Sequence, residues 1–199
     1  MALTDKKFAD GNDSPVSFVG WKSYKLPRVV SSTLAGEAQC FSSASGIAEW
    51  CMLILSEALD GSFSLQNVDE VLQRRSPIGM SDCRSLYDHL ITLGCGGTLD
   101  DKRVAIDVAV IRQSIARSRL QPRWVPTDRM VADGLTKDKG EPLDLLRSVF
   151  RNARYQLADE KEARIRRQEL GRARKENNQQ QTRHVEDSAE PANACLFVW

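Results

Sequence analysis

The chain has 199 residues, which is enough for one globular domain with a tail, and its 41% hydrophobic and 28% charged residues are typical of a protein that folds around a core. The formal net charge of +1 excludes a strongly basic or strongly acidic protein, so a nucleic-acid-binding surface would have to be local. Five cysteines without a C-x-x-C pair, together with only two histidines, do not have the spacing of a zinc site.

The chain start lacks the apolar segment of a secretory signal peptide. No apolar run in the sequence is long enough to cross a bilayer. The odd number of cysteines also suggests reduced thiols. We therefore expect an intracellular protein, cytoplasmic or nuclear, that is not secreted and has no membrane partner.

The first third of the chain predicts a short strand followed by a long helix. Residues 16–21 alternate with a period near two, as in a strand. Hydroxyl residues at 31–33 are candidate N-caps for a helix whose apolar positions recur over 37–59, and Gly61 is a plausible stop. Because residues 50–55 are apolar nearly all round the helix, we expect that end to be deeply buried.

Strands and helices alternate in the rest of the predicted domain, which favours an α/β sandwich, with a possible short hairpin at the start adding antiparallel strands. Short strands are predicted at 77–82 and 123–126. Helices are predicted at 68–72, 84–93, 102–115, 130–135 and 143–157.

Composition changes after Tyr155. Residues 160–176 are rich in charged side chains, 177–181 form an amide run, and 182–199 look disordered. We therefore expect a domain over residues 1–157 and a tail over 158–199 that is charged and helical at first and then disordered. The basic excess near the start of the tail suits either nucleic acid or a solvated helix with internal ion pairs.

Three carboxylates stand out by position. Glu37 lies near the start of the long helix, on the line of its apolar face. Asp82 ends a short apolar strand, and Asp133 interrupts the apolar stretch 130–135. Grouped carboxylates commonly hold a hard divalent cation, and two such cations can drive phosphodiester cleavage. Each residue also has a plainer interpretation: a solvated charge, a favourable charge at a helix N-terminus, or an N-cap at Asp82.

Four segments, in order, resemble the ribonuclease H domain of Copia-type retrotransposon Pol polyproteins. They are WKSYKLPRVVSSTLAGEA at 21–38, MSDCRSL at 80–86, DDKRVAIDVAVIR at 100–112 and WVPTDRMVADGLTK at 124–137. No single segment is specific, and the weight lies in their order and approximate spacing.

This resemblance implies a ribonuclease H-like mixed sheet flanked by helices. It implies that Glu37, Asp82 and Asp133 are catalytic carboxylates and metal ligands for Mg²⁺, with Mn²⁺ as a substitute. The implied reaction is cleavage of the RNA strand of an RNA:DNA hybrid. The implied partners are that hybrid and the reverse transcriptase region that precedes the domain in the family.

The chain departs from the family at its beginning. The family carries a further aspartate on a first strand well ahead of the tryptophan segment, whereas only twenty residues precede Trp21 here. We therefore expect the first strand to be missing and the acidic set to be incomplete, because Asp5, Asp10 and Asp13 all fall in a turn-like region. We therefore expect an RNase H-type endoribonuclease only if the acidic set is completed, and weak or no activity for this chain by itself. The alternative to an enzyme is an inactive relic, or a module that binds nucleic acid or protein.

Basic and hydroxyl residues in two of these segments are candidates for nucleic-acid binding. Lysines and arginine interleaved with Trp21 and Tyr24 suit a phosphate backbone with base stacking, although a solvated connection fits equally well. The candidates are Lys22, Ser23, Lys25, Arg28, Arg84 and Ser85.

Overall fold

A computed structural model describes the chain except for residues 23, 24, 27, 62, 63, 93–98, 100, 160, 162–164, 166, 167, 170, 171 and 173–199. The chain divides into two compact units, Met1–Ala158 and Asp159–Trp199. In the second unit, the described residues within 161–172 are helical and exposed. The disorder expected over 182–199 lies outside the described residues.

An antiparallel sheet is formed by β1 (Ala2–Thr4), β2 (Ser14–Phe18) and β5 (Arg154–Tyr155), in the order β1-β2-β5. The 3-10 helix η1 (Lys6–Asp10) joins β1 to β2. The Asp5 side chain caps it by accepting a hydrogen bond from the Phe8 N–H, and Gly11 closes it with φ of 80°. The hairpin expected at the chain start is therefore present.

A separate parallel pair consists of β3 (Ile78–Ser81) and β4 (Gln121–Trp124), with Ile78 opposite Gln121 and Ser81 opposite Trp124. Two helices, α3 (Arg84–Ile91) and α4 (Lys102–Ser118), form the crossover between these strands. A parallel pair needs such a crossover because a tight turn can join only antiparallel strands.

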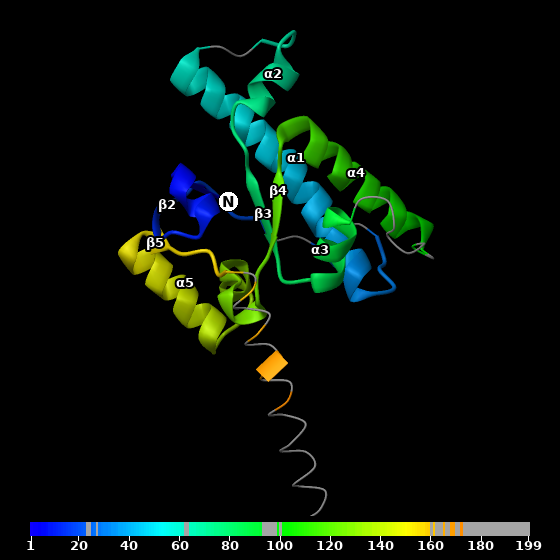
Figure 1. The fold of residues 1–199 in the computed structure, drawn as a ribbon, viewed down its shortest axis with the longest axis vertical. Coiled ribbons are helices and arrows are strands. Elements are labelled where there is room, and N and C mark those ends of the chain that lie inside the picture. Colours follow the sequence, from blue (N-terminus) through cyan, green and yellow to red (C-terminus); the bar gives the residue numbers. More distant parts are fainter. Residues whose placement is uncertain are drawn as a thin grey trace, which may run out of the picture. The chain divides into compact units, whose positions relative to one another are not determined.

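The longest helix is α1 (Thr33–Asp60), which begins after the N-cap Ser32 and ends at Gly61. It packs against α4 beside the parallel pair (Figure 1), and their shared core includes Ala38, Phe41, Val108 and Ile111. A short helix, α2 (Val68–Gln73), packs on the far end of α1 with Met52 and Leu53.

The chain after β4 forms two 3-10 helices, η2 (Thr127–Arg129) and η3 (Val131–Leu135), and then α5 (Glu141–Asn152). Gly134 lets η3 lie directly on α5, because an added Cβ would fall 2.5 Å from the Pro142 carbonyl oxygen. The buried Tyr155 hydroxyl donates to the Arg129 carbonyl at 2.8 Å, which ties β5 to η2.

The expected α/β class is confirmed, but the strands do not form one mixed sheet. Among the described residues, the antiparallel strands β1, β2 and β5 form one sheet, and the parallel strands β3 and β4 form another. The last helix ends at Asn152 rather than 157, because Ala153 takes a left-handed conformation (φ 50°) and the chain continues into β5.

The apolar end of α1 is only partly buried, contrary to expectation. Met52 and Leu53 are buried, whereas Trp50 and Ile54 are 65% and 64% exposed. No helix in the described part of the chain is long and apolar enough to cross a membrane.

Candidate functional site

Glu37 lies in the second turn of α1, half-buried beside the carboxyl end of β3. The Ser81 hydroxyl donates to the Glu37 carboxylate at 3.4 Å and accepts from the Cys83 N–H at 3.1 Å. Ser81 is itself buried. The last residue of β3 therefore positions the helix carboxylate.

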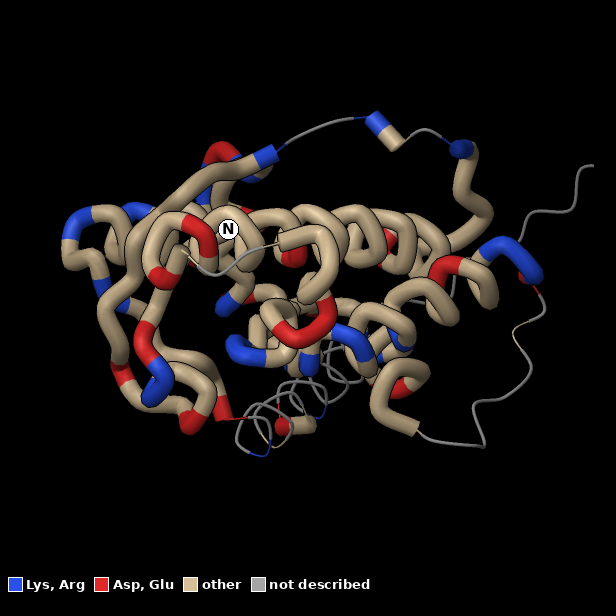
Figure 2. Tube along the Cα trace, turned by 90° about the horizontal axis from the view of Figure 1, so that it is seen from above, with Lys and Arg blue, Asp and Glu red and all other residues tan. Residues whose placement is uncertain are grey.

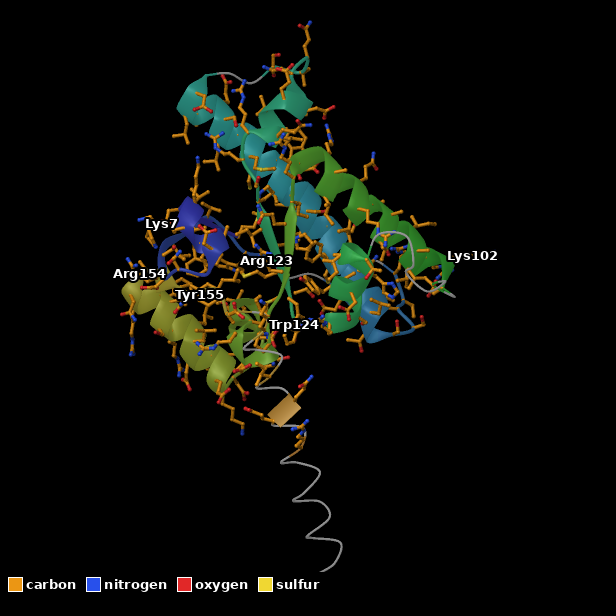
Figure 3. The ribbon with its side chains drawn as sticks, in the orientation of Figure 1. Lys7, Lys102, Arg123, Trp124, Arg154 and Tyr155 are labelled. Atoms are coloured by element: carbon orange, nitrogen blue, oxygen red, sulfur yellow. The ribbon has the colours of Figure 1, made fainter. Side chains whose placement is uncertain are left out.

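Asp82 follows β3 directly and is fixed at two points. The Thr127 hydroxyl donates to the Asp82 carboxylate at 2.9 Å, and the Trp124 indole N–H donates to the Asp82 carbonyl at 3.0 Å. Trp124 is buried at the carboxyl end of β4 (Figure 3). The N-cap of α3 is Cys83, which removes the interpretation of Asp82 as that cap.

Asp133 lies in η3 with its side chain 26% exposed, and it forms an ion pair with Lys137 one turn later. The packing of Gly134 against Leu146 and the Pro142 carbonyl sets the position of this short helix. A 3-10 segment held against α5 therefore presents the third predicted carboxylate.

Both aspartates lie within electrostatic reach of Glu37. The pKa of Glu37 is raised first by burial and then by the charge of Asp82; a hydrogen bond from Ser81 opposes this, and the charge of Asp133 adds to it. Burial, and then the charge of Glu37, also raise the pKa of the Cys40 thiol on the next turn of α1. The fold thus brings α1, the end of β3 and η3 together around a region of negative charge.

The donor chemistry of these residues fits a hard divalent cation, since all three supply carboxylate oxygens whose mutual repulsion a cation would relieve. Among the described residues, however, no three His, Cys, Asp or Glu side chains are already placed to hold a metal ion. Thr127 and Lys137 bind two of the carboxylates. A cation would therefore have to compete with these contacts.

The candidate nucleic-acid-binding residues do not share one arrangement. The Arg28 guanidinium binds both oxygens of Asp107 at 2.8 and 2.6 Å, which anchors the 28–31 connection to α4. Lys22 and Lys25 are exposed, and Ser23 lies outside the described residues. Figure 2 shows acidic and basic residues interspersed along the described trace rather than a stripe of one sign.

The second pair of candidates lies beside Asp82. Arg84 forms an ion pair with Asp88 at 2.9 Å, and its guanidinium lies 5.3 Å from the ring centre of Trp124. Ser85 is exposed, with its hydroxyl 3.3 Å from the Cys83 sulfur. Arg84 and Ser85 therefore lie close to Asp82 in the chain, and Arg84, like Arg28, is paired with a neighbouring aspartate.

Four residues of the site have roles that the sequence did not predict: Ser81, Trp124, Thr127 and Lys137. All four lie within the second and fourth segments quoted for the resemblance. Their contacts could not be predicted, because Trp124 and Thr127 reach back across the crossover to Asp82.

A cavity of about 290 Å³ lies between residues 28–31, α1 and α4, and its lining includes Gln39 and Arg103 but none of the three carboxylates.

Comparisons with known protein families, curated proteins and solved structures found no match to this chain. The function has to be argued from the site itself, because a fold alone does not specify one.

Proposed function

We propose that this chain is a ribonuclease H-type domain of retroelement origin, with Glu37, Asp82 and Asp133 as its acidic centre for metal-dependent cleavage of RNA in RNA:DNA hybrids. The observation that supports this most is the placement of Glu37 on α1 at the carboxyl end of β3, which Asp82 follows and where the Ser81 hydroxyl donates to the Glu37 carboxylate. Burial and the charges of both aspartates raise the pKa of Glu37, and a bound cation would offset that repulsion.

The same three residues would hold Mg²⁺, or Mn²⁺ in its place. When bound, the cation would polarise the phosphodiester and lower the pKa of an attacking water. The chain's own contribution is positioning: Ser81 orients Glu37, and Trp124 fixes the backbone of Asp82. The partners under this proposal are the RNA:DNA hybrid and the reverse transcriptase region of a parent polyprotein.

A non-catalytic role is the second candidate, as an inactive relic or a module that binds nucleic acid or protein. Two observations favour it. Lys137 and Thr127 already occupy Asp133 and Asp82, and the described residues contain no preformed metal cluster. Under this alternative, the carboxylates bind neighbouring side chains instead of a cation.

Cleavage of a labelled RNA:DNA hybrid with Mg²⁺ distinguishes the two candidates. We expect the wild-type chain to cut the RNA strand and Asp82→Asn to lower the rate by about 100-fold or more, the size expected when an electrostatic group at the reacting centre is lost. The matched control is Asp144→Asn on α5, whose side chain is 73% exposed. It should cut at the wild-type rate.

Binding of Mn²⁺, followed by calorimetry, separates loss of chemistry from loss of the site. We expect Asp82→Asn to weaken Mn²⁺ binding and Asp144→Asn to leave it unchanged. No cleavage together with no carboxylate-dependent Mn²⁺ binding would reject the nuclease assignment and leave the non-catalytic candidate.

A further inference from the structure

The parallel pair leaves one edge of β3 without a partner strand. The Gln121 N–H donates to the Pro77 carbonyl at 2.8 Å, and the Val125 N–H donates to the Ser81 carbonyl at 3.0 Å. Because backbone groups of alternate residues point to the same edge of a strand, the N–H and C=O groups of Ile78 and Met80 point away from β4. No strand in the described part of the chain pairs with this edge.

This open edge is not at a bare surface. Gly79 faces α1 so closely that an added Cβ would lie 2.4 Å from the Phe41 ring. On the opposite face, Ile78 and Met80 are partly buried against the cluster that contains Phe8 and Val16. Packed groups thus contact both faces of β3 while one line of its backbone groups has no partner strand among the described residues, although Ile78, Gly79 and Met80 are only partly buried. Such groups form hydrogen bonds to water or to a partner.

A stripe of small and apolar residues runs along α1, the helix that packs on β3. Cys40, Ala44, Ile47, Cys51 and Ile54 recur every three or four residues and so share one face of the helix. We call them the α1 stripe. Cys40, Ala44 and Ile54 are exposed, and the other two are partly exposed.

The α1 stripe does not face α4, whose core contacts on α1 are Ala35, Ala38 and Phe41. At one end of the stripe the Met1 sulfur, just ahead of β1, lies 3.9 Å from the Cys51 sulfur. The open edge of β3 and the α1 stripe thus belong to two elements that pack on each other.

We propose that this region is a docking site for an extended apolar segment of another polypeptide, which pairs with the open edge of β3 and covers the α1 stripe. An extended strand is favoured over a helix because it alone offers N–H and C=O groups at the spacing of Ile78 and Met80. With α1 on one face and the Phe8 cluster on the other, both faces of the added strand are buried. Such strands are continuous apolar runs rich in valine and isoleucine.

This inference is independent of the nuclease proposal, because it concerns backbone pairing and not the carboxylates. The test uses the full chain and a peptide of about six valine and isoleucine residues flanked by lysines. The control peptide has a proline in the middle of the run. We expect only the uninterrupted peptide to bind, to slow hydrogen exchange at the amides of Ile78 and Met80, and to slow alkylation of Cys40 and Cys51.

Two matched variants place the contact. Ile54→Glu in the α1 stripe should weaken peptide binding by at least about tenfold, since a buried aliphatic side chain is worth more than the 1.4 kcal/mol of a tenfold change. Ile106→Glu on α4 is the control, because Ile106 and Ile54 are 61% and 64% exposed. It should bind like the wild type.

A backbone variant tests the pairing itself. Met80→Pro removes a donor from the open edge while leaving the bonds to β4, so it should also weaken peptide binding, with an unchanged circular dichroism spectrum. Equal binding of the two peptides, or of the two glutamate variants, would overturn the docking site. Self-association of the chain that protects the same amides without peptide would instead assign the edge to a second copy and overturn a separate strand.

Discussion

Glu37 is a carboxylate in a place that disfavours its charge. Burial raises its pKa most, and the charges of Asp82 and Asp133 add to the effect. Since the folded-state pKa lies above the unfolded value, the folded chain holds this proton more tightly. Its contribution to stability is therefore fully present at acid pH, below the unfolded value, and is lost as pH rises through the raised folded value.

Replacing Glu37 by glutamine should expose this linkage. Glu37→Gln keeps an acceptor for Ser81 and removes the charge, so we expect a higher melting temperature than wild type at pH 7. The gain should shrink as the pH falls towards the ordinary range of a glutamate carboxyl. Thermal unfolding of both proteins across this range, in chelator, measures it. A gain that is independent of pH would contradict the electrostatic cause.

At this scale, position and motif were enough to choose Glu37, Asp82 and Asp133 as candidates, because each lies on, ends or interrupts an apolar pattern. Their partners could not be predicted. Lys137 is near Asp133 in the sequence, but the Thr127 contact to Asp82 depends on how the crossover closes. The Arg28 contact to Asp107 likewise depends on the packing of the 28–31 connection on α4.

Packing between elements is close where α1 crosses β3. At Gly79, an added Cβ would lie 2.4 Å from the Phe41 ring, whereas Gly46 in α1 has nothing within 4 Å of its added Cβ. Phe41 is buried in the α1–α4 core, so its ring cannot move away freely. The distance between α1 and β3 is therefore set by the absence of a side chain at Gly79.

The two glycines give opposite predictions for the same substitution. Gly79→Ala should lower the free energy of unfolding by about 1–3 kcal/mol through overpacking. Gly46→Ala should raise it by about 1 kcal/mol, because alanine is the better helix former and meets no clash. Urea unfolding of both variants measures the differences. A neutral Gly79→Ala would show that α1 can shift away from β3.

Among the elements, the helices were the more predictable. Ser32, Gly61 and the spacing of apolar residues define α1 locally, and the structure confirms its bounds closely. The two-residue strand β5 was missed because it exists only through pairing with β2. Residues 50–55 were expected to be buried, but Trp50 and Ile54 have no described element over them. Periodicity identifies an apolar face, not what covers it.

At the scale of the whole molecule, the first compact unit ends at Ala158. The boundary predicted from composition, between 157 and 158, is one residue earlier. Composition indicates a boundary here because charged and then amide side chains dominate residues 160–181. It could not predict that the strands would divide into two sheets, since pairing between strands distant in the sequence leaves no local pattern.

Removing residues 159–199 should leave the first unit folded. We expect the chain ending at Ala158 to keep its circular dichroism signal per helical residue and to shift in melting temperature by less than about 2 °C, corresponding to less than about 1 kcal/mol. Unfolding curves of the two chains measure this. A large loss of melting temperature would mean that the second unit contributes to the stability of the first.

The convergence of α1, the end of β3 and η3 also has a consequence for the order of folding. Glu37, Asp82 and Asp133 belong to segments far apart in the chain, and contacts between distant segments form late because loop closure must precede them. The raised pKa of Glu37 depends first on burial and on Asp82, so most of it requires α1 and β3 to be in place, and the smaller contribution of Asp133 requires η3 as well. The protonation of Glu37, followed by isotope-edited infrared spectroscopy during refolding, therefore reports when these distant segments come together.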